Sequence, residues 1–295
     1  MTLNSTQNIV IIRDYIALTK PRIISLLLLT ALCGMFLAAR SVPDPILIFV
    51  VLTGGALAAG GAHSLNHYFE RDLDLLMKRT SGRPVASGRV SPKEAFVFGV
   101  VLNIIAFILL GLLANFLSAV LTLSGTLFYI LVYTIALKRR TSQNIVIGGA
   151  AGAVPPMVGW TAVTGTLDLP AIYMFTIIFF WTPPHFWALA LMIKDDYASA
   201  GIPMLPVVTS VHDTKRSILL YTLMLVSITT MFFTTNSVGW IYLVGSLVLG
   251  TLFIFYAWRL LRRPMIEGAR STYLYSLLYL ALLFALIASD GLLLA

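Results

Sequence analysis

The chain has 295 residues, of which 59% are hydrophobic and only 11% are charged, and its mean hydropathy is +0.92. Soluble globular proteins carry roughly 25% charged residues, so this composition excludes a soluble protein and indicates an integral membrane protein. The formal net charge of +8 could suggest a nucleic-acid partner, but in a membrane protein such a charge must first be compared with the topology.

Nine apolar runs are each long enough to cross a bilayer as a helix, which takes about 20 residues. In chain order they lie near residues 23–39, 46–65, 95–115, 116–137, 145–163, 171–193, 217–235, 240–261 and 273–294. Nothing is left for a separate soluble domain. We therefore expect an all-α polytopic membrane protein, with nine transmembrane helices in a single bundle that forms one domain over residues 1–295.

The basic residues distinguish the two sides of this topology. With nine spans, the N-terminus and the loops after the even-numbered spans share one side, and all of the 20 basic residues except Arg40 fall there. By the positive-inside rule this side is cytoplasmic and the C-terminus lies outside, so the charge reports topology and no nucleic-acid partner is expected. Residues 1–12 contain no Lys or Arg, so we expect neither a signal peptide nor a transit peptide, and a prokaryotic plasma membrane is the expected location.

Carboxylates and basic side chains crowd the segment directly after the second span, N-H-Y-F-E-R-D-L-D-L-L-M-K-R-T. Asn66, Glu70 and Asp74 recur every four residues, so on a continuous helix they share one face and could hold a divalent cation. The nearby basic residues would suit a diphosphate; they are Arg71, Lys78, Arg79 and Arg83. The alternative is a solvated loop whose charges pair with one another.

Basic residues also follow the fourth span, in Y-T-I-A-L-K-R-R. Lys138 and Arg139 could bind lipid headgroups, or they could hold a diphosphate or a substrate carboxylate. Tyr129 and Tyr133, one helical turn apart, could line a cavity there, although tyrosine is common at membrane interfaces.

A second acidic pair, Asp195 and Asp196, stands at the end of the sixth span. It has the same expected orientation as Asp72 and Asp74 after the second span, so the two acidic groups could bracket a metal diphosphate.

The sixth span itself contains W-T-P-P-H-F-W. His185 is a functional candidate because ionisable residues inside a membrane are costly, although a neutral histidine bonded to a backbone carbonyl is the ordinary alternative. Trp181 and Trp187 could shield a carbocation, stack on a flat ring, or simply pack.

Three further features stand near these segments. His63 and His67, one turn apart, flank the start of the acidic segment and are candidates for metal or iron ligands. The pairs Pro155-Pro156 and Pro183-Pro184 remove helix hydrogen bonds, which in lipid is tolerated only where the freed groups face protein or a cavity. The glycine- and alanine-rich stretches in the second and fifth spans could serve close helix packing, or make room for a flat ligand.

Three stretches resemble signatures of the UbiA superfamily of intramembrane prenyltransferases. They are N-H-Y-F-E-R-D-L-D-L-L-M-K-R-T-S-G-R-P, L-K-R-R-T-S-Q-N-I-V-I-G-G-A-A-G-A-V-P-P-M-V-G-W, and W-T-P-P-H-F-W-A-L-A followed by K-D-D-Y-A-S-A-G-I-P-M-L-P-V. The likeness runs from about Lys20 to Asp290. His185 stands where the branches with aromatic acceptors usually have Asp, and it points to the branch that farnesylates protoheme IX.

The resemblance implies a Mg²⁺-dependent enzyme that transfers a farnesyl group from farnesyl diphosphate to a vinyl group of protoheme IX, giving heme O. Carried over by motif, the metal ligands would be Asn66, Glu70, Asp74, Asp195 and Asp196. Candidate catalytic residues are Asp72, Asp74, Arg79, Tyr133, Lys138 and His185. Candidate cofactor- and substrate-binding residues are Arg71, Lys78, Arg83, Arg139, Trp181 and Trp187. Glu70 departs from the usual Asp of the motif, which puts its direct ligand role in doubt.

Three rival functions stay open on the sequence. A prenyltransferase of the same family could act on an aromatic quinone precursor. A secondary transporter would also have broken helices and buried ionisable residues. A non-catalytic heme-binding or oxidase assembly subunit would bind heme without making a product. The sequence also leaves open whether a heme A synthase or a terminal oxidase docks on the protein.

Overall fold

The structure is a computed structural model that describes the backbone of residues 5–293 and the side chains of residues 12–293. Within this range, nine helical segments are long and apolar enough to cross a membrane. They are Pro21–Ala39 (α2), Pro45–Phe69 (α3), Pro92–Leu113 (α5), Phe116–Leu137 (α6 and η1), Asn144–Thr164 (α7 and α8), Leu169–Met192 (α9), Val211–Thr235 (α12 and η2), Trp240–Arg262 (α13) and Ala269–Leu293 (α14). All nine predicted spans are confirmed, although residue 294, the expected end of the last one, lies outside the described residues.

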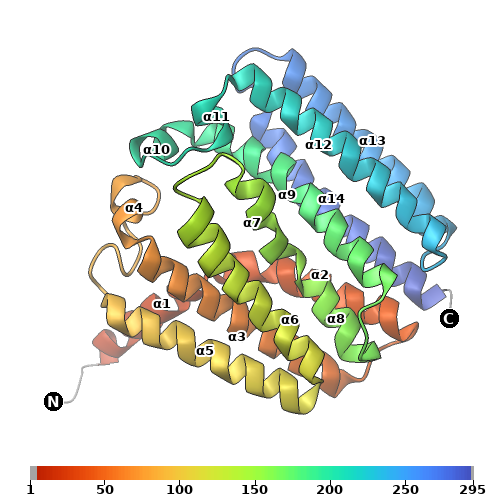
Figure 1. Cartoon of the computed structure of the whole chain (residues 1–295), viewed down its shortest axis with the longest axis horizontal. Coiled ribbons are helices and arrows are strands. Elements are labelled where there is room, and N and C mark those ends of the chain that lie inside the picture. Colours follow the sequence, from red (N-terminus) through yellow and green to blue (C-terminus); the bar gives the residue numbers. More distant parts are fainter. Residues whose placement is uncertain (1–4, 294–295) are drawn as a thin grey trace.

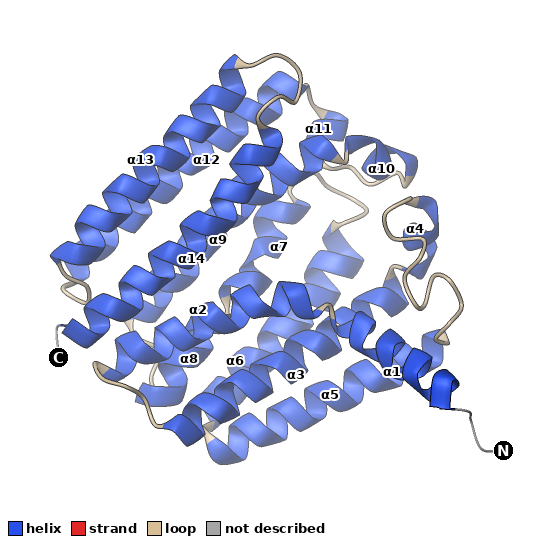
Figure 2. Cartoon of the chain, turned by 180° about the vertical axis from the view of Figure 1, so that it is seen from behind, coloured by secondary structure: helices blue, strands red, loops and turns tan. Residues whose placement is uncertain are grey.

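The long helices lie side by side in one bundle (Figures 1 and 2). The last helix, α14, packs against α2, α9 and α13, so it is part of the bundle rather than an appendage. Three short helices of the polar loops lie together at one end of the bundle: α4 (Arg71–Leu76), α10 (Lys194–Ser199) and α11 (Leu205–Val208). The C-terminus lies at the opposite end (Figure 1). Both acidic loops are therefore on the same side of the bundle.

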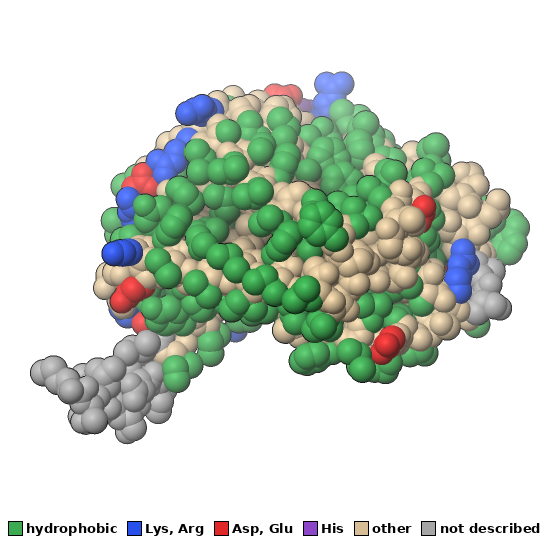
Figure 3. Space-filling view, turned by 60° about the horizontal axis from the view of Figure 1, so that its bottom comes forward, with side chains coloured by type: hydrophobic (Ala, Val, Ile, Leu, Met, Phe, Trp, Pro, Cys, Tyr) green, Lys and Arg blue, Asp and Glu red, His purple; other side chains and the backbone are tan. Residues whose placement is uncertain are grey.

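The outer surface is suited to lipid. Large apolar side chains point outward on many helices; for example, Leu112 is 79% exposed and Trp240 is 71% exposed. In the space-filling view of Figure 3, hydrophobic side chains cover the middle of the surface and charged side chains lie toward its edges. An apolar surface of this extent is expected where acyl chains replace water around a polytopic protein.

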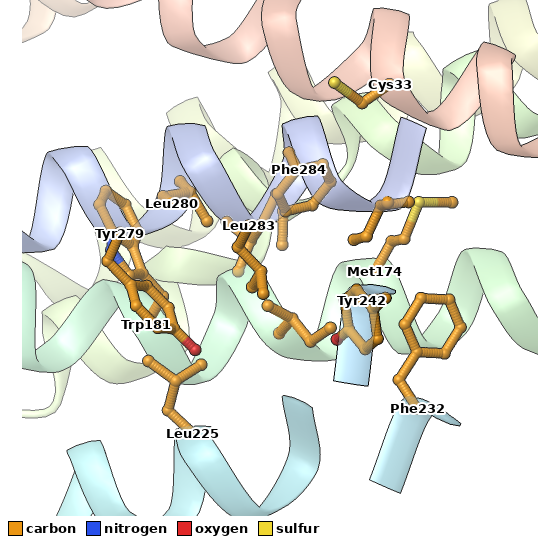
Figure 4. Packing of buried hydrophobic residues seen from close by; sticks show 14 of the residues in the cluster. Cys33, Met174, Trp181, Leu225, Phe232, Tyr242, Tyr279, Leu280, Leu283 and Phe284 are labelled. Atoms are coloured by element: carbon orange, nitrogen blue, oxygen red, sulfur yellow. The ribbon is translucent and has the colours of Figure 1, made fainter. Parts of the chain in front are cut away.

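A large apolar core joins α9, α12, α13 and α14 (Figure 4). Two fully buried tyrosines in it keep their hydroxyl groups bonded. Tyr242 donates to the carbonyl oxygen of Thr229 at 2.8 Å, and the Tyr279 hydroxyl lies 3.1 Å from that of Thr229. Because an unpaired hydroxyl in this core would be costly, these bonds fix the relative rotation of α12, α13 and α14.

One segment forms a helix that the hydropathy pattern does not predict. Residues Ser5–Thr19 make α1, which packs against α3 ahead of the first span. Asp14 of α1 accepts from Arg89 Nε at 3.0 Å, in the loop that follows α4. This ion pair holds α1 against the polar end of the bundle.

The two proline pairs behave differently. Pro155 begins α8 (Pro155–Thr164) after α7 (Asn144–Ala153), so the fifth span is broken at Val154. Pro183 and Pro184 instead lie inside α9, which continues to Met192, and both prolines are buried. The two prolines of α9 therefore face protein, as expected where a proline frees backbone groups that would be costly in lipid.

Glycine lets α2 and α8 touch through their backbones. A Cβ atom placed on Gly159 of α8 would overlap the carbonyl oxygen of Ala31, and one on Gly34 of α2 would lie 2.5 Å from that of Pro156. Neither oxygen can move without shifting a helix. Close helix packing therefore accounts for this part of the glycine-rich fifth span.

We expect Gly159→Ala to destabilise the protein by about 1–3 kcal/mol, because the added methyl group forces the two helices apart. Gly152→Ala is the matched control on α7, since a Cβ atom there would meet nothing within 4 Å. Alanine favours helix by up to about 1 kcal/mol over glycine, so this variant should be neutral or slightly stabilised. Thermal unfolding of the purified proteins in detergent checks the comparison, and equal effects of the two substitutions would contradict it.

Candidate functional site

The acidic segment forms the junction between α3 and α4. Although α3 ends at Phe69, the N–H of Glu70 donates to the carbonyl of Asn66 at 2.9 Å, and the N–H of Asp74 donates to that of Glu70 at 2.8 Å. The four-residue spacing therefore continues through the junction. The residues Asn66, Glu70 and Asp74 are 1%, 2% and 1% exposed, so the face that they share points into the protein.

Each of the two buried carboxylates is paired with a cation from a distant or neighbouring segment. Glu70 Oε1 accepts from Lys138 Nζ at 2.5 Å, which joins α3 to the end of the fourth span. Both carboxylate oxygens of Asp74 accept from Arg83 Nη1, at 2.8 and 2.9 Å. Burial raises the pKa of Glu70, but the charge of Lys138 and its hydrogen bond outweigh burial, and the net pKa lies below its usual value. The charges do pair with one another, but inside the protein rather than in a solvated loop.

A third cation, Lys20, completes this group and is absent from the residues that the sequence singles out. Its Nζ donates to Asn66 Oδ1 at 3.1 Å, and Asn66 Nδ2 donates to Thr134 Oγ1 at 3.3 Å. Burial, followed by the charge of Arg83, lowers the pKa of Lys20 to about 7. The available signal was its position directly before the first span, on the side that carries the other basic residues. What we call the buried charge cluster consists of four buried residues, Asn66, Glu70, Asp74 and Lys138, and two half-buried cations, Lys20 and Arg83.

Lys138 reaches this cluster from η1, a π-helix over Phe128–Leu137. The N–H of Lys138 donates to the carbonyl of Tyr133, five residues earlier, at 2.9 Å. The rings of Tyr129 and Tyr133 stack with centroids 5.5 Å apart, and Lys138 Nζ lies 5.8 Å from the Tyr133 centroid. A Cβ atom on Gly148 would overlap the ring of Tyr133, so this glycine makes room for an aromatic ring of the chain itself. Short π-helical segments are often found at functional sites.

The second acidic pair lies on α10, next to α4. Tyr197 of α10 belongs to the same apolar cluster as Leu73 and Met77, and Ser199 Oγ donates to the carbonyl of Leu76 at 3.3 Å. The side chain of Asp195 is exposed and that of Asp196 is half-buried. The two acidic loops are thus neighbours on one side of the bundle, as the sequence predicts.

The cluster provides the type of ligand that Mg²⁺ requires. Its acceptors are amide and carboxylate oxygens, which suit a hard cation that also binds substrate phosphates. Among residues 12–293, however, no group of three or more Asp, Glu, His or Cys side chains lies close enough to hold a metal ion. Asn66, Glu70 and Asp74 therefore fit the metal by chemistry, while their oxygens are engaged by Lys20, Lys138 and Arg83.

The other polar candidates in the loop after α3 lie outside the cluster. Asp72 and Arg139 form an ion pair at 2.7 Å, with side chains 60% and 41% exposed, and the hydrogen bond from Arg139 lowers the pKa of Asp72. Arg71 donates to the carbonyl of Tyr68 at 2.6 Å and lies over the Tyr68 ring. Lys78 and Arg79 are also exposed. These side chains could meet a ligand only at the mouth of the site.

His185 lies in an aromatic stack between α9 and α14. Its ring is 4.2 Å from that of Trp181 and 4.8 Å from that of Tyr273, measured between centroids, and its Nδ1 is 2.7 Å from Ser276 Oγ. The partner is a serine hydroxyl, not a backbone carbonyl. Trp187 is buried nearby, with no partner for its N–H among the described residues. No hydrogen bond or ion pair between described residues joins this stack to the buried charge cluster, but Phe186, edge-on to His185, packs in the same apolar cluster as Tyr133.

Comparison with known proteins identifies the family of this chain. The model of the UbiA prenyltransferase family matches residues 27–283. Proteins named "Protoheme IX farnesyltransferase" are 48% identical over 280 residues in Roseiflexus sp. (strain RS-1) and 52% identical over 278 residues in Thermus thermophilus. These alignments cover 95% and 94% of this chain but 52% and 46% of those proteins, so the chain spans about half their length. The protein of that name in Gloeobacter violaceus is 48% identical over 281 residues, with 95% and 92% covered.

Solved structures show the same fold at low identity. A digeranylgeranylglyceryl phosphate synthase superposes with a TM-score of 0.79 at 16% identity, covering 95% of this chain and 98% of that one. A UbiA homolog from Archaeoglobus fulgidus bound to GPP and Mg²⁺ gives 0.65 at 16% identity, covering 93% and 99%. At this identity the likeness concerns the fold alone.

The Glu70–Lys138 pair should be strongly coupled, because removal of one partner leaves a buried charge alone. We expect Glu70→Gln and Lys138→Met each to cost about 3–5 kcal/mol of stability, and the double variant to recover most of the loss. The exposed Asp72–Arg139 pair is the matched control, for which Asp72→Asn and Arg139→Gln should show coupling of about 0–1 kcal/mol. Unfolding in detergent measures both cycles. Additive losses at Glu70 and Lys138 would disprove the coupling.

Lys20 should make anion binding depend on pH. A bound diphosphate favours the charged ammonium and raises the pKa of Lys20 from about 7, so binding at pH 8 should take up close to one proton at this residue. Affinity for inorganic diphosphate should then fall by up to about tenfold per pH unit above that pKa. In Lys20→Arg the guanidinium stays charged, so the proton uptake at residue 20 and the resulting pH dependence of affinity should vanish. Calorimetry in buffers of different ionisation enthalpy measures the difference; equal proton uptake in both proteins would refute it.

Proposed function

Because the chain belongs to the UbiA prenyltransferase family, we propose that it transfers a farnesyl group from farnesyl diphosphate to a vinyl group of protoheme IX, forming heme O and releasing diphosphate. The single observation that carries a diphosphate substrate is the buried charge cluster, in which three cations and three oxygen ligands meet at one end of an apolar bundle. The choice of acceptor rests on the relatives named "Protoheme IX farnesyltransferase", the Gloeobacter violaceus protein among them.

The ion pairs of the cluster suggest how a diphosphate is received. Lys138 and Arg83 are held by Glu70 and Asp74 at 2.5 and 2.8 Å. A diphosphate carries more negative charge than a carboxylate, so it can draw these cations onto its own oxygens and free the two acids. Asn66, Glu70 and Asp74, with Asp195 or Asp196 from α10, would then hold Mg²⁺, which supplies further positive charge to the leaving diphosphate.

The chemistry then follows from charge and exclusion of water. The farnesyl C1–O bond breaks, and its electron pair leaves with the diphosphate, whose charge is stabilised by Lys20, Lys138 and Arg83. The π electrons of the heme vinyl group form the new bond to C1. Water adds to the resulting cation and loses a proton, which leaves the hydroxyl group. The stacked rings of Tyr129 and Tyr133 border the cluster, and their faces suit a transient allylic cation.

The proposed orientation in the membrane follows from the uneven distribution of basic residues between its two sides. We place the end that carries α1, α4 and α10 in the cytoplasm of a prokaryote and the C-terminus outside, because all basic residues except Arg40 are expected on the first side. The acids sit at that end and not at the midplane where transporters bind their cargo, which favours an enzyme. Heme O would pass from the site to a heme A synthase or a terminal oxidase.

Asp74→Ala should abolish heme O formation, since it removes a buried oxygen ligand and leaves Arg83 unpaired. Membrane insertion should persist, because α3 and its apolar contacts are unchanged. Asp213→Asn, an exposed carboxylate at the start of α12, is the control and should keep activity. The measurement is the mass of hemes extracted from cells that lack their own heme O synthesis. If the Asp74→Ala protein inserts into the membrane and still forms heme O at the wild-type level, the proposed role of Asp74 is wrong.

The acceptor needs its own test. Membranes that contain the protein are supplied with farnesyl diphosphate and Mg²⁺, and with either heme B or 4-hydroxybenzoate. Farnesylated product from heme B alone is the expected result. Product from 4-hydroxybenzoate alone would reassign the protein to quinone precursors, and absence of diphosphate release with either acceptor would reject the prenyltransferase reaction.

A further inference from the structure

Two histidines of α3 are buried without partners beside the charge cluster. His63 is 8% exposed and His67 is 2% exposed. None of their four ring nitrogens has a hydrogen-bond partner among the described residues, and each nitrogen atom is itself covered. A buried polar atom that lacks a hydrogen-bond partner lowers stability by about 1–3 kcal/mol, so these two rings destabilise the protein considerably if their only role is packing. Their presence points to a ligand.

The two rings belong to the same face as the acids. His63, His67, Glu70 and Asp74 follow at intervals of four, three and four residues, which places them on one stripe of the helix. Both histidines lie within electrostatic range of Lys20 and Arg83. The stripe therefore runs from the charge cluster into the apolar interior of the bundle.

Depth distinguishes the two histidines. At about 1.5 Å of rise per residue, His67 lies roughly 4.5 Å beyond Glu70 along the axis, and His63 lies roughly 10 Å beyond it. The His63 ring meets the ring of Tyr129 edge-on, with centroids 5.8 Å apart. His63 is thus the histidine that lies farther from the phosphate-binding end, where its ring contacts Tyr129.

The shape of the proposed heme acceptor fits this difference in depth. Its vinyl groups sit on the rim of a flat macrocycle, and its iron sits at the centre. If the macrocycle stands along the axis of the bundle with its reacting vinyl group beside farnesyl C1, the iron lies deeper than the diphosphate by the radius of the ring. A neutral imidazole is the common nitrogen ligand of heme iron.

We propose that His63 coordinates the iron of the heme acceptor and so sets the depth at which the vinyl group meets the farnesyl cation. This inference rests on the proposed function. His67, one turn nearer to Glu70, is too close to the diphosphate to take the same role. The His63 nitrogens are covered by neighbouring atoms, so coordination of the iron requires these neighbours to move aside.

The test is spectroscopic and does not need turnover. Ferric heme is titrated into the purified protein in lipid nanodiscs and followed by absorption and electron paramagnetic resonance. The wild type should show an imidazole-ligated heme. His63→Ala and His63→Gln should lose this signature and bind heme at least tenfold more weakly, and added imidazole should restore the signature to His63→Ala. His212→Ala, at an exposed position at the start of α12, should match the wild type.

Iron-free protoporphyrin IX separates ligation from general packing. It should bind the wild type and both His63 variants with equal affinity, because it offers no metal to the imidazole. Loss of protoporphyrin affinity in both His63 variants would mean that His63 only shapes the cavity, and this would overturn the proposal. An unchanged heme spectrum in the His63 variants, or loss of the signature only in His67→Ala, would overturn it as well.

Product analysis keeps the two proposals apart. Heme O made by the wild type, together with an unchanged heme spectrum in the His63 variants, would reject iron ligation and keep the enzyme. An imidazole-ligated heme in a wild type that forms no heme O would reject the transferase and keep the ligand, as expected for a heme-binding assembly subunit.

Discussion

Buried charge must be neutralised in an apolar bundle, and this constraint determines the arrangement of the polar end of the molecule. Glu70 and Asp74 are almost fully inaccessible to solvent, and each is matched by a cation that comes from a different place in the chain. Lys138 comes from the fourth span, Arg83 from the loop after α4, and Lys20 from the junction of α1 and α2. The pairing therefore ties together segments that apolar packing alone would not bring into register.

The pairing of acids with bases also affects how the cluster could bind ligands. Glu70 and Asp74, the two buried acids that could bind a metal, are each engaged by a base that could bind a phosphate. A lone divalent cation would meet acids already compensated, and a lone diphosphate would draw cations away from carboxylates that then stay buried and unpaired. A complex of the two satisfies both sets at once. If the proposed function holds, this arrangement would favour arrival of the metal together with the diphosphate over arrival of either one first.

The sequence was sufficient to predict the spans and the helix face that Asn66, Glu70 and Asp74 share, for physical reasons. Length and hydropathy define a transmembrane helix almost completely, and a four-residue spacing defines a helix face. Lys20 and the bonding of His185 could not be obtained in this way, because both depend on which helices become neighbours. The prolines show the same limit, since Pro155 begins a new helix and Pro184 does not, and only the surrounding protein distinguishes them. Hydropathy likewise did not predict the helix α1.

The placement of Asp195 and Asp196 was predicted only in part. Hydropathy and the count of spans put α10 on the same side as α4, and the apolar contact of Tyr197 with Leu73 and Met77 brings the two short helices together. The rotation of the acidic side chains depends on this contact and not on spacing. The side chain of Asp195 is consequently exposed.

The π-helix of the fourth span has a consequence for how this protein can vary. Its wider turns determine which of two adjacent cations enters the protein, since Lys138 reaches Glu70 while Arg139 turns outward to Asp72. Loss of a single residue anywhere in Phe128–Leu137 would return the segment to ordinary winding and rotate this pair about the axis. Substitutions along the lipid-facing side of the segment can be absorbed, but its length cannot change without exchanging the inner cation for the outer one.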